Sequence, residues 1–419
     1  MREREAVEIA AYQARLDEAL RSAAPYPNGL WHGRGIVICG GGDTHFPCAW
    51  VCISMLRKLR CGLPIELWHR GPREMTDAMR ALVAPLKVTC VDAYQVALRH
   101  PVRRLDGWEL KPYAIAFSGF EEVLYLDADN MAVVNPEFLF SSEPYSKNGA
   151  LFWPDRYTGP GTGREWLTRE AWEICRVPYR IEPELESGQM VIDKRPSWLP
   201  LQLTLHINSH SDFYYRYFYG DKDTFHLAWR RVGADYALAP SPPRNLGDSE
   251  VIVQCGFDRE VLFQHRNRDK WSLSRPNRRI GGFLLEEECL EALDTLRQKW
   301  TLAASSPGQL SEQEKRYYDL LCGQRFFTYE MEDLPRRTIE LRSDFTLGAG
   351  ATAVENRWMI EDDKDGCPVL SLRNENGAAC FLRSSDDGIW RGRLLVYERL
   401  AVELRPAAVA SGTIIAAAL

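Results

Sequence analysis

The first third of the chain alternates between two hydrophobic patterns. Short unbroken apolar runs predict buried strands, and apolar residues that recur every three or four positions predict helices. The predicted strands are residues 35–39, 64–68, 86–91 and 122–126, and the predicted helices are residues 46–60, 75–84 and 111–120. Because strands and helices follow one another in turn, the sequence predicts an α/β domain built on a doubly wound sheet.

The pattern changes toward the C-terminus. Helical spacing over residues 289–324 predicts a connector, and beyond residue 336 short alternating segments are separated by pairs such as Asp387-Gly388. Such pairs favour tight hairpins, so a small antiparallel β module is expected there. The predicted organisation is an N-terminal helix over 1–30, the α/β domain over 31–300, a helical connector over 301–335, the β module over 336–408 and an alanine-rich tail over 409–419.

Composition and charge narrow the class of protein. With 45% hydrophobic and 26% charged residues, the chain has the composition of a globular protein. Its formal net charge of -6 gives no general attraction to the phosphates of nucleic acids, so a nucleic-acid partner is not expected. The 13 tryptophans indicate packed cores or surfaces that face carbohydrate. The 11 cysteines lack C-x-x-C pairs, which favours reduced thiols.

The N-terminal segment is a charged helical pattern. Residues 1–24 contain no long apolar stretch, so neither a signal peptide nor a membrane anchor is expected. We therefore expect a soluble, cytoplasmic chain without a transmembrane segment.

The middle of the chain contains the aromatic stretch FYYRYF at residues 213–218. Such a cluster either lines a substrate site or packs in a core. Aromatic clusters are usually packing elements, so the core interpretation is favoured.

Two acidic residues directly follow the predicted strand 122–126. Asp127 and Asp129 are separated by one residue at the carboxyl end of this apolar strand, which is where open α/β sheets bind their ligands. A D-x-D pair alone is common in exposed turns. After a buried strand, however, two carboxylates are costly to desolvate unless a cation pairs with them, so a divalent metal ion that carries a diphosphate is the expected partner.

A second candidate lies far downstream, where Phe263-Gln264-His265 is followed by Lys270. A single histidine is more often a structural residue than a ligand. Together with Asp127 and Asp129, however, the imidazole would complete a ligand set suited to Mn²⁺, and Lys270 would neutralise phosphate charge.

A run of three glycines at 40–42 follows the first predicted strand. The run lacks the Lys-Ser/Thr of a P-loop and the spacing of the dinucleotide fingerprint. It has two interpretations, a wall for the base and ribose of a nucleotide or a simple turn. In the first case the contacts would come from Gly40, Gly41, Asp43, Thr44 and Lys111.

Several motifs stand in a recognisable order along the chain. They are KPYAIAFSGFEEVLYLDADN at 111–130, ESGQMVIDK at 186–194, GDKDTFHLAW at 220–229 and a late His-x-x-x-x-Lys at 265–270. This order resembles the fungal α-mannosyltransferase family typified by the yeast α-1,2- and α-1,3-mannosyltransferases. More loosely, it resembles the glycogenin and galactosyltransferase family of retaining enzymes. The resemblance covers roughly residues 33–272.

The resemblance implies a GT-A type glycosyltransferase domain that uses Mn²⁺ (or Mg²⁺) and a nucleotide-sugar donor. In the relatives the D-x-D and the late His and Lys hold the metal and the diphosphate. Mapped onto this chain, the metal ligands are Asp127, Asp129 and His265, and Lys270 contacts the phosphates.

The resemblance also implies a reaction, the transfer of a hexose to a hydroxyl of a carbohydrate or glycosylated acceptor with retention of configuration. The residues expected to hold the sugar and the acceptor are Glu186, Gln189, Asp221 and Asp223.

The chain departs from the glycogenin-like pattern at two positions. Glu186 stands where those enzymes usually carry Asn, and Lys222 stands where they carry Gln between two acids. The ESGQ and GDKDTF forms favour the mannosyltransferase side. GDP-mannose is therefore the first expected donor, and a UDP-hexose is the second.

Two other functions fit parts of the pattern. A carbohydrate-binding protein with a catalytically silent GT-A domain would use the β module for recognition, but the intact Asp127, Asp129 and His265 argue against it. A nucleotide-sugar pyrophosphorylase also uses an α/β sheet, but its Gly-rich N-terminal loop followed by Arg and Lys is absent from this sequence.

Overall fold

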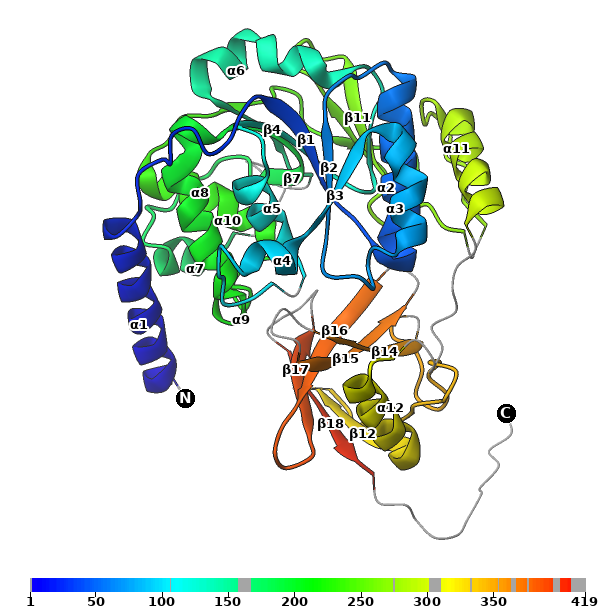
Figure 1. Cartoon of the computed structure of the whole chain (residues 1–419). Helices are drawn as coiled ribbons and strands as arrows, with labels where there is room; N and C mark the ends of the chain where they lie inside the picture. The colour runs from blue at the N-terminus through cyan, green and yellow to red at the C-terminus, as the bar shows by residue number, and fades with distance from the viewer. Residues whose placement is uncertain are drawn as a thin grey trace. The chain divides into compact units, whose positions relative to one another are not determined.

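The computed structural model describes residues 2–105, 107–156, 167–273, 276–300, 310–331, 334–352, 354–362, 367–374, 377–394 and 400–407. The chain divides into two compact units, Met1–Leu302 and Ala303–Leu419, which Figure 1 colours from blue to yellow-green and from yellow to red. Separate hydrophobic cores lie in the two units. The tail expected over 409–419 lies outside the described residues.

A seven-stranded sheet forms the centre of the first unit, in the order β3-β2-β1-β4-β7-β6-β8. Its strands are β1 (Arg34–Cys39), β2 (Ile65–His69), β3 (Val88–Asp92), β4 (Glu122–Asp127), β6 (Ala150–Pro154), β7 (Leu185–Asp193) and β8 (Ala237–Leu238). The strands β3, β2, β1 and β4 run parallel, whereas β7 runs antiparallel to both β4 and β6. The four predicted strands are therefore confirmed, and they lie next to one another.

Helices cover both faces of this sheet (Figure 1). They are α1 (Arg2–Arg21), α2 (Gly42–Lys58), α3 (Asp77–Val83), α4 (Ala93–Ala97), α5 (Leu110–Phe117), α6 (Glu143–Asn148), α7 (Arg169–Ile174), α8 (Lys194–Ser209), α9 (Ser211–Tyr214), α10 (Asp221–Val232) and α11 (Glu286–Lys299), with short 3-10 turns η1 (Ala84–Leu86) and η2 (Pro136–Ser141). Successive strand side chains point to opposite faces. Thus Ile36 and Leu124 join a core with α2 and α11, while Val37 and Val123 join one with α5, α8 and α10.

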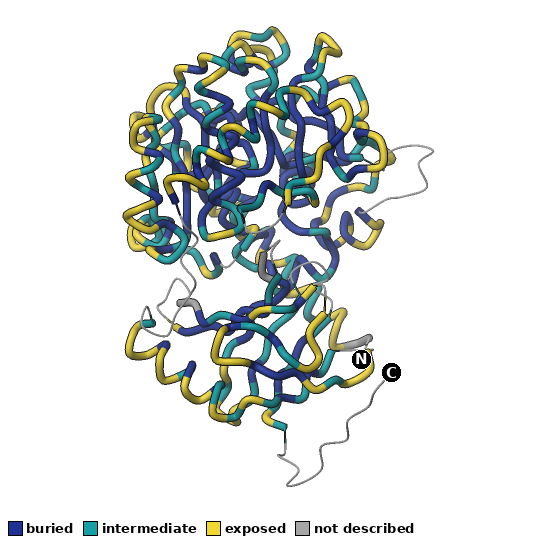
Figure 2. The backbone as a smooth tube through the Cα atoms, turned by 90° about the vertical axis from the view of Figure 1, so that its right-hand side faces the viewer, coloured by how far each residue is buried: buried dark blue, intermediate teal, exposed yellow. Residues whose placement is uncertain are grey.

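The aromatic stretch 213–218 runs through α9 toward α10. Five of its six side chains are buried, with exposed fractions between 0% and 7%: Phe213, Tyr214, Tyr215, Tyr217 and Phe218. The core interpretation of this stretch is therefore confirmed. Figure 2 shows the same distribution along the whole backbone, with buried segments inside and exposed ones at the surface.

A second, four-stranded sheet continues from the first. Its order is β5-β11-β10-β9, with β5 (Asn130–Ala132), β9 (Arg244–Asn245), β10 (Ile252–Cys255) and β11 (Val261–His265) paired antiparallel. The chain leaves β4 at Asp127 and enters β5 at Asn130, so the D-x-D segment is the junction between the two sheets. This junction positions the candidate site.

The second unit is an antiparallel sheet of seven strands in the order β13-β12-β18-β17-β16-β15-β14. Its strands are β12 (Phe326–Met331), β13 (Arg337–Glu340), β14 (Arg357–Asp362), β15 (Pro368–Asn374), β16 (Gly377–Ser384), β17 (Trp390–Leu394) and β18 (Ala401–Pro406). Helix α12 (Glu312–Gln324) packs on β14 and β15. The two units confirm the expected fold class, an α/β domain followed by a small all-β module.

The beginning of the β sheet differs from the sequence expectation. We expected a helical connector over 301–335, but β12 lies inside that range and pairs with both β13 and β18. Phe327 and Tyr329 of β12 point into the core of the second unit, and Tyr318 and Leu321 of α12 pack against the same core. Residues 326–331 therefore form a strand, because their alternating apolar side chains pack into this core, and the helix that precedes them ends at Gln324.

Among the residues that the structure describes, no helix is both long and apolar enough to span a membrane.

The separate cores give a first prediction. A protein that ends at Leu302 should fold on its own, because the core clusters of the first unit draw on residues up to Trp300 and the core cluster of the second unit starts at Tyr318. We expect one cooperative thermal transition and a near-UV circular dichroism signal from its buried tryptophans. A fragment with helical far-UV signal but no near-UV signal would show that the first unit needs the second.

Candidate active site

The D-x-D carboxylates lie where β4 ends. Asp127 is the last residue of β4 and pairs in register with Cys39, the last residue of β1. The carboxyl ends of these parallel strands therefore meet at one edge of the sheet. At this edge Asp129 is only 7% exposed, so its charge needs a partner.

The second sheet supplies that partner. Strand β5 pairs with β11 so that Asn130 lies opposite His265, and the His265 Nε2 atom lies 3.0 Å from Asp129 Oδ1 and 4.0 Å from Asp127 Oδ2. In the loop after β11, Lys270 also forms an ion pair with Asp129. The structure thus brings together Asp127, Asp129, His265 and Lys270, as the sequence predicted.

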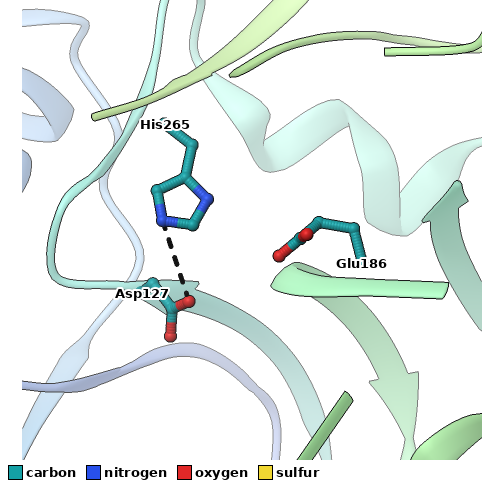
Figure 3. Close-up of side chains that lie close together, drawn as sticks. All are labelled: Asp127, Glu186 and His265. Atoms are coloured by element: carbon teal, nitrogen blue, oxygen red, sulfur yellow. Dashed lines mark ion pairs between the residues drawn. The ribbon is translucent and has the colours of Figure 1, made fainter. Parts of the chain in front are cut away.

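Glu186 completes the cluster from the other neighbour of β4. Because β7 runs antiparallel to β4, the N-terminal end of β7 lies at the carboxyl end of β4. Ligand atoms of Asp127, Glu186 and His265 all lie within 4.8 Å of one another, and Figure 3 shows the three side chains converging. Two carboxylates and one imidazole form an oxygen and nitrogen set that fits Mn²⁺ or Mg²⁺.

This geometry changes the expected ligand set. We predicted Asp127, Asp129 and His265 as metal ligands and Glu186 as a sugar contact. In the structure Asp129 is engaged by Lys270 and His265, whereas Glu186 lies in the compact triad. We therefore add Glu186 to the predicted metal ligands.

A lysine of α5 contacts the Asp127 carboxylate at the same edge of the sheet. Lys111 of α5 lies 3.1 Å from Asp127 Oδ1 and 3.1 Å from Asp221 Oδ2, and its Nζ donates to the Ser187 hydroxyl at 2.8 Å. The Tyr125 hydroxyl donates to Asp127 Oδ1 at 2.8 Å. These contacts fix the orientation of the Asp127 carboxylate before any ligand binds.

A second charged cluster surrounds Lys222, the second residue of α10. Its ammonium lies 2.7 Å from Asp155 Oδ2, 3.4 Å from Glu184 Oε2 and 3.2 Å from Asp223 Oδ1. All four residues are at most 8% exposed. One buried cation therefore faces three buried carboxylates, and the second oxygen of each carboxylate accepts a backbone N–H, from Arg156, Leu167 and Tyr219.

Burial and neighbouring charges shift the pKa values of several of these groups. Burial alone would lower the pKa of His265, but the carboxylates of Asp129 and Asp127 raise it. Burial alone would raise the pKa of Asp129, but Lys270 and His265 hold it far below its usual range. Burial, reinforced by Asp155, raises the pKa of Glu186 to about 7. The cluster thus contains ionised pairs beside one carboxyl that is readily protonated.

One predicted sugar contact, Gln189, also contacts the start of the second sheet. Gln189 is fully buried, and its Oε1 accepts from the Asn130 side chain at 2.6 Å, so it holds β7 against the start of β5. The same Asn130 amide donates to the Gly188 carbonyl at 2.8 Å. A sugar contact from Gln189 stays a prediction.

The glycine run packs closely around the site. A Cβ at Gly40 would lie 3.2 Å from Ala128 Cβ, between the two acids, and a Cβ at Gly41 would lie 2.5 Å from the Glu74 carbonyl oxygen. Gly41 is the N-cap of α2, whose first turn contains Asp43 and Thr44. The tight turn is therefore required by packing, and it lies beside the D-x-D segment. Nucleotide contacts from Gly40, Gly41, Asp43 and Thr44 stay a prediction.

Sequence reasoning did not assign Tyr125, Ser187, Asp155, Glu184 or Lys222 to the site. Tyr125 carried a usable signal, because a residue two positions before Asp127 lies on the same face of β4. Asp155 and Glu184 come from different strand ends and have no fixed spacing from Lys222, so only the fold reveals their contact.

Known proteins are similar to this chain over the region that contains most of the site residues. The family model described as "Mannosyltransferase putative" matches residues 33–165 and 177–263, more than half of the chain. The α-1,2-mannosyltransferase MNN21 of Candida albicans is 27% identical over 261 residues, which are 50% of this chain and 39% of the relative. The α-1,2-mannosyltransferase MNN2 of Saccharomyces cerevisiae is 26% identical over 280 residues, 57% of this chain and 46% of the relative. The matched region thus spans less than half of either relative.

Solved structures overlap with the chain more weakly. A galactosyltransferase LgtC complex with donor and acceptor sugar analogues shares 14% identity at a TM-score of 0.35, covering 49% of this chain and 73% of that chain. The bifunctional glycosyltransferase WbbM shares 10% identity at a TM-score of 0.39, covering 52% of this chain and 40% of that chain. These overlaps are too low to assign a function, which rests on the sequence family.

Gly188 gives a test of the site geometry. A Cβ on this residue would lie 2.7 Å from His265 Nδ1 and 2.9 Å from His265 Cε1, so Gly188→Ala should displace the imidazole. We expect a changed imidazole resonance in histidine-labelled protein and a loss of about 1–3 kcal/mol in the free energy of unfolding. Gly281→Ala is the control, because a Cβ there meets nothing within 4 Å. Unchanged His265 resonances in the Gly188 variant would contradict the described packing.

Proposed function

Because this chain belongs to the mannosyltransferase family whose model matches it, we propose that it is a metal-dependent, retaining mannosyltransferase that uses GDP-mannose. The acceptor would be a hydroxyl group of a carbohydrate or a glycosylated molecule. The convergence of Asp127, Glu186 and His265 at one sheet edge, with Lys270 beside it, is the observation that carries this proposal.

The lysine and histidine end of the site suits a diphosphate. Lys270 and His265 both pair with Asp129, and a metal ion held by Asp127, Glu186 and His265, with Asp129 alongside, would supply charge stabilisation to the leaving nucleoside diphosphate. Lys270 would then turn from Asp129 to a phosphate oxygen. Stabilising charge on the leaving group is the largest contribution a site of this kind can make to the rate.

The opposite end of the site suits the sugar. Asp221 and Asp223 stand in the first turn of α10, and Lys222 between them fixes Asp155 and Glu184. Carboxylates accept hydrogen bonds from sugar hydroxyls, and those that are buried do so without competition from water. Asp221 remains paired with Lys111, so one lysine links the sugar end to the metal end through Asp127.

Retention of configuration follows from the same arrangement in our proposal. The acceptor would attack from the side of the leaving group, whose phosphate oxygen would take the acceptor proton. The protein would then need no carboxylate base on the opposite face. Its own residues would instead stabilise the leaving charge through Lys270 and hold the sugar through Asp221 and Asp223.

Substitution of the D-x-D carboxylates should abolish transfer while the fold persists. In Asp127→Asn and Asp129→Asn we expect nucleotide release from GDP-mannose to fall by at least about 100-fold, because an amide cannot replace a carboxylate as a metal ligand or as a partner of Lys270. EDTA should inactivate the wild-type protein and Mn²⁺ should restore it. Asp294→Asn, on the exposed side of α11, is the control. Wild-type turnover in either site variant would refute the assignment.

The donor can be tested in the same assay. We expect nucleoside diphosphate release with Mn²⁺ to be fastest from GDP-mannose and slower from UDP-glucose, UDP-galactose and UDP-N-acetylglucosamine. A preference for a UDP-hexose would support the alternative function, a glucosyltransferase or galactosyltransferase.

The configuration of the product tests retention. NMR of the first product from an α-linked donor should show an α linkage. A β linkage would refute retention and point to Glu186 or Asp223 as a general base.

A further inference from the structure

One tryptophan near the site differs from the others. Among the tryptophans that the structure describes, all but one are at most 9% exposed, while Trp108 is 36% exposed. Trp108 lies just before α5, in a segment where the Gly107 backbone N–H and the Ser211 hydroxyl both donate to the Glu109 carboxylate. The exposed indole is therefore carried by a backbone that is fixed from both sides.

The ring itself rests on a glycine. A Cβ at Gly220 would lie 2.5 Å from Trp108 Cε3, so the indole packs directly on the Gly220 backbone. Gly220 has φ +80° and is the N-cap of α10, a conformation that favours glycine. The rings of Tyr215 and Tyr219 lie with their centroids 6.2 Å from that of Trp108. Trp108 and Tyr219 thus form an aromatic platform whose two ring planes are tilted by 40° and whose indole contacts the Gly220 backbone.

The platform borders the sugar end of the site. The Trp108 carbonyl accepts from the Lys111 backbone N–H at 3.1 Å, in the turn that places the Lys111 ammonium 3.1 Å from Asp221. On the other side, the Tyr219 N–H donates to Asp223 Oδ2 at 2.8 Å. The Tyr219 backbone is thus bonded to Asp223, which we assign to sugar binding, and the Trp108 backbone is linked through Lys111 to Asp221.

An exposed aromatic ring in this position matches the chemistry of a sugar. The C–H face of a hexose ring is apolar and packs on an aromatic face, while its hydroxyls need hydrogen-bond acceptors. The buried carboxylates of Asp221 and Asp223 suit a sugar that is enclosed by the site. Trp108 is instead open to solvent, the side from which the second sugar must arrive.

We propose that Trp108, supported by Gly220 and Tyr219, stacks on the sugar ring of the acceptor and orients its hydroxyl toward the site. This inference rests on the proposed function. It adds an acceptor subsite of stated chemistry, a hexose ring bound by stacking, to a site whose donor groups lie elsewhere.

The test separates acceptor binding from donor turnover. Nucleotide release is measured at saturating GDP-mannose as a function of α-linked mannobiose, and again without mannobiose to record donor hydrolysis. Trp108→Ala should raise the KM for mannobiose about 5- to 10-fold, whereas Trp108→Phe should stay within about 3-fold of wild type because a ring remains. The KM for GDP-mannose and the rate of donor hydrolysis should be unchanged in both. Phe138→Ala, at an aromatic that is 47% exposed on η2, is the matched control.

Each outcome bears on one proposal. An unchanged KM for mannobiose in a folded Trp108→Ala protein overturns the acceptor subsite, and a raised KM for GDP-mannose instead assigns the ring to the donor sugar. If wild-type protein releases nucleotide from none of the donors, the proposed function fails. The subsite is then tested by titration calorimetry with mannobiose alone. Weaker binding to Trp108→Ala than to wild type supports stacking. Equal binding to the two proteins, or no binding to wild type, refutes it.

Discussion

The carboxylates Asp127 and Asp129 at the end of β4 are paired with basic side chains that come from separate parts of the chain. Lys111 comes from α5, His265 from β11 and Lys270 from the loop that follows β11. Leaving one such charge unpaired would cost several kcal/mol, so the pairs constrain how these elements can lie around β4. The candidate site is therefore also a junction on which the packing of the first unit depends.

The same junction explains why two positions beside the site are glycine. Because β5 follows β4 directly after Asp129 and β7 runs antiparallel beside β4, the backbones of three strands come close together near Asp127. Gly188 leaves room for the His265 ring, and Gly40 leaves room for Ala128 between the acids. Close approach of backbone, rather than flexibility, is what requires glycine at both positions.

Charge is divided across the site in a way that suits a two-part ligand. Cations gather around Asp129 at one end, and carboxylates gather around Lys222 at the other, with Lys111 between Asp127 and Asp221. A diphosphate sugar has the complementary order, with anionic phosphates followed by neutral hydroxyls. The second unit has its own core and supplies none of the residues assigned to this site.

The sequence by itself determined the α/β pattern, the C-terminal β module and the position of Asp127 and Asp129 after a buried strand, because these depend on local hydrophobic periodicity. The resemblance added His265 and Lys270 as metal and phosphate residues, and the structure places both against Asp129. Only the tertiary structure placed Glu186 beside Asp127, turned Gln189 toward Asn130 and tied Asp155 and Glu184 to Lys222. The physical reason is register: which strand end meets which, and which face each side chain takes, follows from pairing between segments far apart in sequence.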